Sequence, residues 1–228
     1  LYWLHHAMRA HENPALDVAV TLARQLEMPL LVYQALPESY PFASDRHHRF
    51  ILEGALDLQE ELVRRGISYA FHLERAGHRG PHLPTLCARA AAVVTDDMPV
   101  EPLSTWTQQL ADSSPAPVLC VDTACLAPMP ILGQPFERAF QFRKHTKYLY
   151  RERLEQSWSD AGAAPNADHF DLPFEPLDLS NCNLAELISR CEIDHAIGPV
   201  PHTRGGSVAG YARWEEFKRR GLAQYAKR

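Results

Sequence analysis

The sequence lacks the patterns that define several common classes of protein. No uninterrupted apolar run approaches the ~18 residues of a membrane-spanning helix, so we expect no membrane partner. The cysteines number five, and none of them forms a CxxC pair. An odd number of unpaired cysteines favours free thiols in a reducing compartment over a disulfide framework, so a cytoplasmic protein is expected.

Motifs for nucleotide phosphates and for a catalytic serine are also missing. The loop after the first apolar stretch contains neither GxGxxG nor GxxxxGK[ST], which argues against a standard dinucleotide or P-loop site. No GxSxG elbow occurs. The net charge is −5, so the surface as a whole is not built to hold nucleic acid, although it allows a local basic face.

Apolar and amphipathic stretches alternate over the first half of the chain. The apolar stretches predict strands at residues 1–4, 29–36, 67–73, 90–97 and 116–122. Between them, apolar residues recur at helical spacing, as in Leu16, Ala19, Val20, Ala23 and Leu26, or in Ile51, Ala55, Leu58 and Leu62. Strands that alternate with helices through short connections predict an α/β fold with a parallel sheet and helices on both faces.

The pattern changes after residue 122. Residues 137–158 predict a basic, aromatic helix, whereas residues 161–204 are irregular and proline-rich, with one helical turn near 184–190. Ser207 is the predicted N-cap of a last helix. Its apolar stripe consists of Tyr211, Trp214, Phe217, Leu222 and Tyr225. The sequence starts without Met and stops on a helical pattern, so we expect a piece of a longer protein.

Polar residues near the start raise the question of a metal site. His5 and His6 are adjacent at a strand end, so their side chains are expected to point to opposite faces. Asn is a favoured N-cap, and Pro at the first helical position loses no hydrogen bond. Asn13-Pro14 therefore predicts a strand-to-helix turn, and we expect no metal among His5, His6, His11 and Glu12.

Two further groups of residues leave alternatives open. Asp96-Asp97 follows the fourth strand, where it suits either a ribose or polar ring or a plain turn. The basic stretch interleaves Arg138, Arg143, Lys144, Lys147, Arg151 and Arg153 with Phe140, Phe142, Tyr148 and Tyr150. This composition suits nucleic acid, but a solvated helix has it too. We interpret His72, His169 and His195 as structural or exposed.

The first loop also carries a family resemblance. WLHHAMRAHENPAL resembles the RRDLRLxDNPAL signature of the photolyase/cryptochrome family. The matching residues are Trp3, Arg9, Asn13, Pro14, Ala15 and Leu16, whereas His5, His6, Ala7 and Glu12 stand where the family usually has Arg, Arg, Asp and Asp. The Asp replaced by Ala7 usually organises this loop. AAVVTDDMPVEPLSTW and CVDTACLAPMP resemble class II cyclobutane-dimer photolyases, and GGSVAGYARW resembles the helix that opens the family's FAD-binding domain.

The resemblance implies a division into three parts. Residues 1–160 would form a Rossmann-like antenna domain, 161–204 an interdomain linker, and 205–228 the start of a helical domain whose remainder holds FAD and damaged DNA. It implies an intact, monomeric deoxyribodipyrimidine photolyase, with no catalytic residue in this segment. The alternatives are a cryptochrome-like photoreceptor and a free-standing nucleotide-binding α/β domain.

The resemblance also implies a place for an antenna chromophore. In the family, the amino-terminal domain can hold a folate or a deazaflavin in a cleft at the strand ends. The positions expected to line that cleft are His6, Arg9, Leu36, Asp96, Asp97 and Met98.

Overall fold

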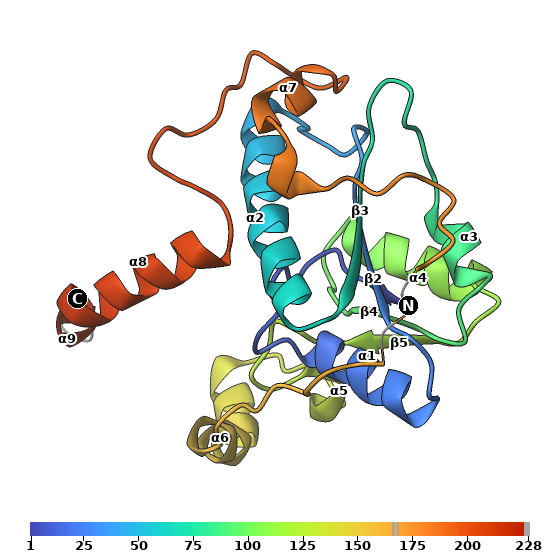
Figure 1. Cartoon of the computed structure of the whole chain (residues 1–228). Helices are drawn as coiled ribbons and strands as arrows, with labels where there is room; N and C mark the ends of the chain where they lie inside the picture. Colours follow the sequence, from blue (N-terminus) through green and yellow to red (C-terminus); the bar gives the residue numbers. More distant parts are fainter. Residues whose placement is uncertain (166, 168, 226–228) are drawn as a thin grey trace.

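A computed structural model describes residues 1–165, 167 and 169–225 of the chain (Figure 1). Five parallel strands form one sheet in the order β3-β2-β1-β4-β5. Their bounds are Tyr2–Trp3 for β1, Leu31–Leu36 for β2, Ser68–Leu73 for β3, Val93–Asp96 for β4 and Val118–Val121 for β5. The predicted α/β fold with a Rossmann-like parallel sheet is confirmed. The strand order reverses beside β1, which is where such sheets hold ligands.

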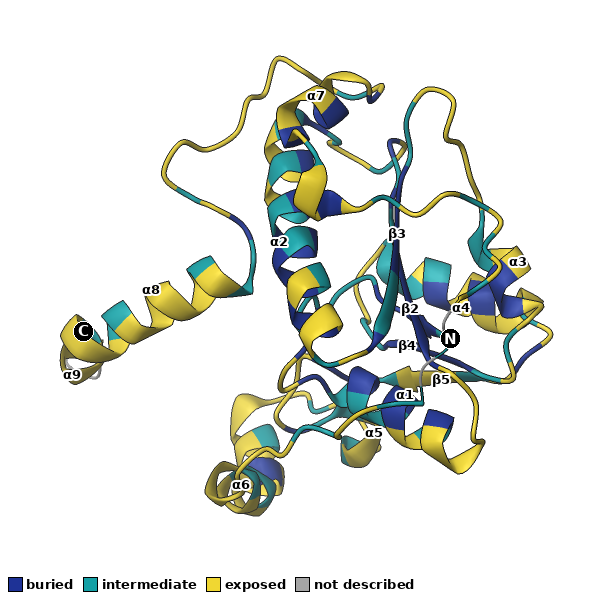
Figure 2. Cartoon of the chain, viewed as in Figure 1, coloured by how far each residue is buried: buried dark blue, intermediate teal, exposed yellow. Residues whose placement is uncertain are grey.

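Side chains alternate between the two faces of the sheet. Tyr2 and Val32 pack with helices α1 (Pro14–Gln25) and α2 (Asp45–Arg64) on one face. Trp3 and Tyr33 pack with helices α3 (Leu83–Cys87) and α4 (Leu103–Ser113) on the other. Figure 2 shows the buried stripe of α2 turned toward the strands. Both faces of the sheet are therefore covered over β1 to β4, which explains their nearly continuous apolar sequences, while the edge strand β5 is partly exposed.

The turn into α1 forms as Asn13-Pro14 predicts. Asn13 is the N-cap, and its Oδ1 accepts the Leu16 N–H at 3.1 Å, while Pro14 takes the first helical position. The Asn13 side-chain amide also donates to the carbonyl oxygens of Ala7 at 3.1 Å and Arg9 at 2.9 Å. The same residue thus caps the helix and holds the loop that precedes it.

The second half of the chain wraps over this sheet. Helices α5 (Met129–Leu132) and α6 (Ala139–Glu155) follow β5, and α6 occupies most of the predicted 137–158 helix. The 3-10 turn η1 (Leu179–Asn181) and α7 (Leu184–Ser189) pack on α2, so the predicted helical turn near 184–190 is confirmed. No helix in the described part of the chain is long and apolar enough to cross a bilayer.

Helix α8 (Ser207–Arg220) begins differently from the prediction, because its N-cap is Gly206 and not Ser207. Gly206 has φ 100°, and a Cβ at this position would overlap the Asp57 carboxylate. That carboxylate accepts the Val208 N–H at 3.0 Å, while the Ser207 hydroxyl donates to Glu61 at 2.7 Å. Carboxylates on α2 therefore cap α8 in place of the serine.

The predicted apolar stripe of the last helical segment is exposed in this structure. Tyr211 and Trp214 on α8 are 44% and 49% exposed, and Tyr225 on α9 (Leu222–Tyr225) is 73% exposed. In Figure 1, α8 extends away from the sheet. Residues 226–228 of this segment, and residues 166 and 168 of the predicted linker, lie outside the described residues.

Candidate ligand-binding site

A cavity of about 670 Å³ lies between the sheet and the helices α3 and α4, and it reaches the carboxyl ends of β2 and β3. The strands contribute Trp3, Tyr33, Ala35 and His72, while the surrounding loops and helices contribute His5, His82, Cys87, Trp106 and Leu110. The volume is within the range of about 300–1,000 Å³ that small-molecule sites occupy. The position also matches the rule that parallel sheets bind ligands at their carboxyl edge.

Aromatic rings form much of the wall. The Trp3 and His5 ring centroids are 4.7 Å apart, and His72 stands edge-on to His82 at 4.4 Å. Phe174, from the segment between α6 and the 3-10 turn η1, does not line the cavity, but its ring packs against both histidines, 4.7 Å from His82 and 5.2 Å from His72. Flat aromatic walls with a few polar atoms are suited to a planar ring system, which they can contact face to face or edge to face.

Two histidines bring buried nitrogens without partners to this wall. Among the described residues, nothing hydrogen-bonds Nδ1 or Nε2 of His5, or Nε2 of His72. His72 is only 6% exposed. Leaving such a group unpaired costs about 1–3 kcal/mol, so each of these enclosed nitrogens would gain a partner if its ring turned toward a polar ligand atom in the cavity.

Both imidazoles are neutral at pH 7. Burial lowers the pKa of His72 to about 4, and the neighbouring His82 adds to the effect. Burial also lowers the pKa of His5, against the opposing influence of the Asp96 carboxylate. A neutral imidazole offers one N–H donor and one acceptor nitrogen, so the pair can bind the mixed donor and acceptor edge of an uncharged heterocycle.

The predicted site residues do not line this cavity. Asp96 is fully buried, and its carboxylate accepts the Tyr2 hydroxyl at 3.2 Å and the backbone N–H groups of His5 at 3.2 Å and His6 at 3.1 Å. The carboxylate that organises the first loop therefore comes from β4, the strand beside β1, and not from the position of Ala7.

The remaining predicted residues lie at two places. Arg9 donates to the carbonyl oxygens of Glu12 at 3.1 Å and Thr123 at 3.0 Å, and Asp97 and Met98 are half-buried in the loop after β4. Leu36 is buried in a separate cluster beneath α7. Their role in chromophore binding stays a prediction. No group of three or more His, Cys, Asp or Glu side chains in the described residues is arranged to hold a metal ion.

His72, which the sequence analysis interpreted as structural or exposed, is buried and lines the cavity. In β3, Tyr69, Phe71 and Leu73 face α2, so Ala70 and His72 face the opposite side. The sequence did contain a signal for this position: a polar side chain on a covered face of the sheet, one residue before the strand ends.

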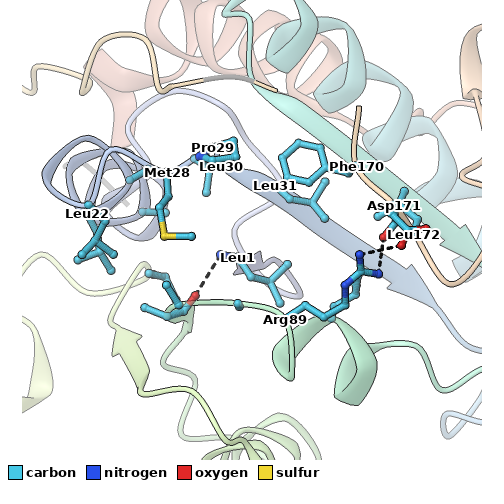
Figure 3. A pocket seen from close by; sticks show the side chains of 18 residues that line it. Leu1, Leu22, Met28, Pro29, Leu30, Leu31, Arg89, Phe170, Asp171 and Leu172 are labelled. Carbon is cyan, nitrogen blue, oxygen red and sulfur yellow. Dashed lines mark hydrogen bonds and ion pairs between the residues drawn. The ribbon is translucent and has the colours of Figure 1, made fainter. Parts of the chain in front are cut away.

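A smaller cavity of about 200 Å³ lies at the amino ends of the strands (Figure 3). Its walls are mostly aliphatic, and the amino group of Leu1 donates there to the Ala92 carbonyl at 3.0 Å. Arg89, at its rim, is paired with Asp171 at 2.8 Å. The size, the paired charge and the location at the edge away from ligand sites favour the larger cavity as the functional one.

Comparison with known proteins gives a family match. The family model described as DNA photolyase matches residues 1–155. The deoxyribodipyrimidine photo-lyase of Methanothermobacter thermautotrophicus is 29% identical over 133 residues, which are 57% of this chain and 28% of that protein. The enzyme of the same name from Potorous tridactylus is 22% identical over 221 residues, 95% of this chain and 40% of that protein. The chain thus spans less than half the length of these relatives.

Solved structures share the fold. A cryptochrome from Synechocystis sp. PCC6803 superposes with a TM-score of 0.67 at 15% identity, covering 99% of this chain and 47% of that one. The archaeal photolyase from Sulfolobus tokodaii, solved with two FAD molecules, gives a TM-score of 0.53 at 16% identity over 96% of this chain and 47% of that one.

Proposed function

The chain belongs to the DNA photolyase family, and from this premise we propose that it is the amino-terminal portion of a class II-type deoxyribodipyrimidine photolyase. The intact protein then repairs cyclobutane pyrimidine dimers in DNA by light, with FAD and the flipped-out dimer held by a helical domain that follows. In this proposal, residues 1–160 are the antenna domain, 161–204 the linker and 205–228 the start of the helical domain.

We further propose that the 670 Å³ cavity holds the antenna chromophore, either a deazaflavin or a folate. The observation that carries this assignment is the set of buried, unpartnered nitrogens on His5 and His72. A bound chromophore supplies absorption in the near-ultraviolet or blue. The S. tokodaii photolyase, which has this fold, was solved with two FAD molecules and is described as implying a novel light-harvesting cofactor, which supports the proposal of a chromophore here.

The protein's own part in this function is to bind and shield the ring. His5 and His72 offer hydrogen bonds to its polar edge, while Trp3 and Tyr33 contact its faces. Because both imidazoles are neutral, binding requires no counter-charge. A bound ring would be enclosed by mostly apolar side chains, and a hydrogen bond in such an environment is stronger than in solution.

The proposal is tested at two levels. Purified intact protein is expected to show flavin absorption bands and to remove cyclobutane dimers from DNA only in the light. An intact protein that binds flavin and leaves the dimers in place would support a cryptochrome-like photoreceptor instead. A natural gene product that ends near residue 228 would contradict the photolyase proposal and favour a free-standing nucleotide-binding domain.

The antenna assignment is tested separately on the 228-residue chain. Titration with a deazaflavin or a folate is expected to give a bound absorption band with a shifted maximum and quenched Trp fluorescence, because Trp3 and Trp106 line the cavity. Absence of a bound band with either compound at millimolar concentration would reject the antenna site and leave the family membership intact.

A further inference from the structure

We propose that the outer face of α6 binds the sugar–phosphate backbone of DNA, independently of sequence and of damage. This inference goes beyond the proposed function, in which DNA is held by the domain that follows. The outer face consists of Phe140, Arg143, Lys144, Lys147, Tyr148 and Arg151, and it ends with Leu154 and Glu155.

The first observation is that α6 is attached to the protein by one side only. Thr146 is the only buried residue among its 17 residues. On the inner side, the ring of Phe136 lies 5.7 Å from Phe142 and 5.0 Å from His145, and Tyr150 lies 6.4 Å from Phe142. The other side of the helix faces solvent, as Figure 2 shows.

The second observation is the order of the side chains on the outer face. Arg143, Lys147 and Arg151 follow one another at four-residue spacing and form a row along the helix. The row extends about 12 Å, which matches about three to four phosphates at the 3.4 Å rise per phosphate of one DNA strand. Phe140 and Tyr148 flank it and are 62% and 75% exposed, as is suitable for stacking on sugars or unpaired bases.

The third observation is that these cations lack acidic partners. Within the described part of the chain, no ion pair involves Arg143, Lys144 or Lys147, and Arg151 has only a loose contact of 3.4 Å with Glu155. Like charges at four-residue spacing repel one another and weaken a helix. The protein has a net charge of −5, yet this row of cations is not neutralised by its own acidic side chains. The row is therefore suited to bind an external polyanion.

Helix α8 provides the contrast within the same chain. Its three terminal cations are Lys218, Arg219 and Arg220, and they pair with Glu215 and Glu216. That is how a merely solvated helix balances its charge. The aromatic residues beside the α6 row further favour nucleic acid over an acidic protein, because stacking and phosphate contact are then made by one ligand.

The test is fluorescence anisotropy of this chain, in the dark, with an undamaged random-sequence DNA duplex between 50 and 200 mM salt. Four phosphate contacts predict a slope of log K against log salt of about −3.6. The triple variant R143Q/K144Q/K147Q is expected to bind more than tenfold more weakly and to lower the slope by about 2.7. Glutamine is a good helix former, and circular dichroism is expected to show unchanged helix content.

The matched control is K218Q/R219Q/R220Q, which removes the same formal charge from α8 and is expected to leave DNA affinity and slope unchanged. A second variant, F140A/Y148A, is expected to weaken binding to single-stranded DNA more than binding to duplex DNA. The proposal fails if the two triple variants behave alike, if wild-type chain shows no binding at 50 mM salt, or if anionic phospholipid vesicles compete as well as DNA does. Since undamaged DNA is used in the dark, these outcomes do not depend on repair activity.

Discussion

The Tyr2 hydroxyl donates a hydrogen bond of 3.2 Å to the Asp96 carboxylate, which joins β1 to β4 across 94 positions of sequence. Both residues are fully buried, and burial together with the Asp96 charge raises the pKa of Tyr2 well above its usual value. Because Asp96 also accepts the backbone N–H groups of His5 and His6, this one carboxylate fixes the loop that carries His5 to the cavity.

Replacing Asp96 with alanine is expected to destabilise the fold strongly. The change leaves the Tyr2 hydroxyl and two backbone N–H groups without an acceptor, and we expect a loss of about 3 kcal/mol or more in the free energy of unfolding. The matched control is D97A, because Asp97 is half-buried and lies outside this network; its cost is expected within about 0.5 kcal/mol. Urea denaturation measures both, and equal losses would contradict the assignment.

The substitution H72F is expected to have opposite effects on stability and on binding. It keeps a ring in the cavity wall and removes the unpaired nitrogen, so the ligand-free chain should become more stable. Affinity for a deazaflavin or folate should fall about tenfold, the equivalent of one hydrogen bond. H169F changes an exposed histidine and is the control. Unchanged affinity in H72F would exclude the cavity as the chromophore site.

The stability of the chain is expected to fall between pH 7 and pH 5. Burial lowers the folded-state pKa of His48 and His72 to about 4, against about 6.5 in the unfolded chain. A lowered folded-state pKa stabilises the protein fully above the unfolded value, and this contribution is lost as the pH falls from about 6.5 to about 4. At pH 5 the contribution of each histidine to the free energy of unfolding is about 2 kcal/mol smaller than at neutral pH.

This pH dependence is checked by urea unfolding at both pH values. H72F should lose about 2 kcal/mol less than wild type between pH 7 and pH 5, because the contribution of His72 is then absent while those of His48 and His5 remain. H202F, at an exposed position, should show the wild-type dependence. A wild-type protein equally stable at pH 5 and pH 7 would be inconsistent with neutral, buried imidazoles.

Local sequence chemistry was enough to predict the sheet and its first turn. The apolar runs gave the strands, and Asn13-Pro14 gave the start of α1, because both depend on neighbours in sequence. The site depended on contacts between distant residues. The pattern of β3 placed His72 on a covered face, but it did not show that His82 packs edge-on to it and lines a cavity there. Nor could the sequence pattern show that the carboxylate of Asp96 already accepts hydrogen bonds from the loop after β1.

The start of α8 shows the same limit, since Ser207 has good N-cap chemistry, yet Asp57 caps the helix from α2. The structure also places the segment around Gly205 against α2, where its N–H donates to Glu53 at 2.8 Å. Arg204, next to it, pairs with Asp57 at 2.7 Å. The attachment of α8 to the α/β domain therefore depends on the backbone of two glycines fitting closely against one helix.

Replacing Gly205 with alanine is expected to release α8 from α2. A Cβ at this position would overlap the carbonyl oxygen of Phe50, a backbone atom that cannot move aside without disturbing α2. Trypsin should then cleave after Arg204 at least tenfold faster, because losing the contact exposes that bond. G210A is the control: a Cβ there meets no atom within 4 Å, and replacing glycine inside a helix should stabilise α8 by about 0.5–1 kcal/mol. Equal cleavage rates in the two variants would show that α8 is not held through Gly205.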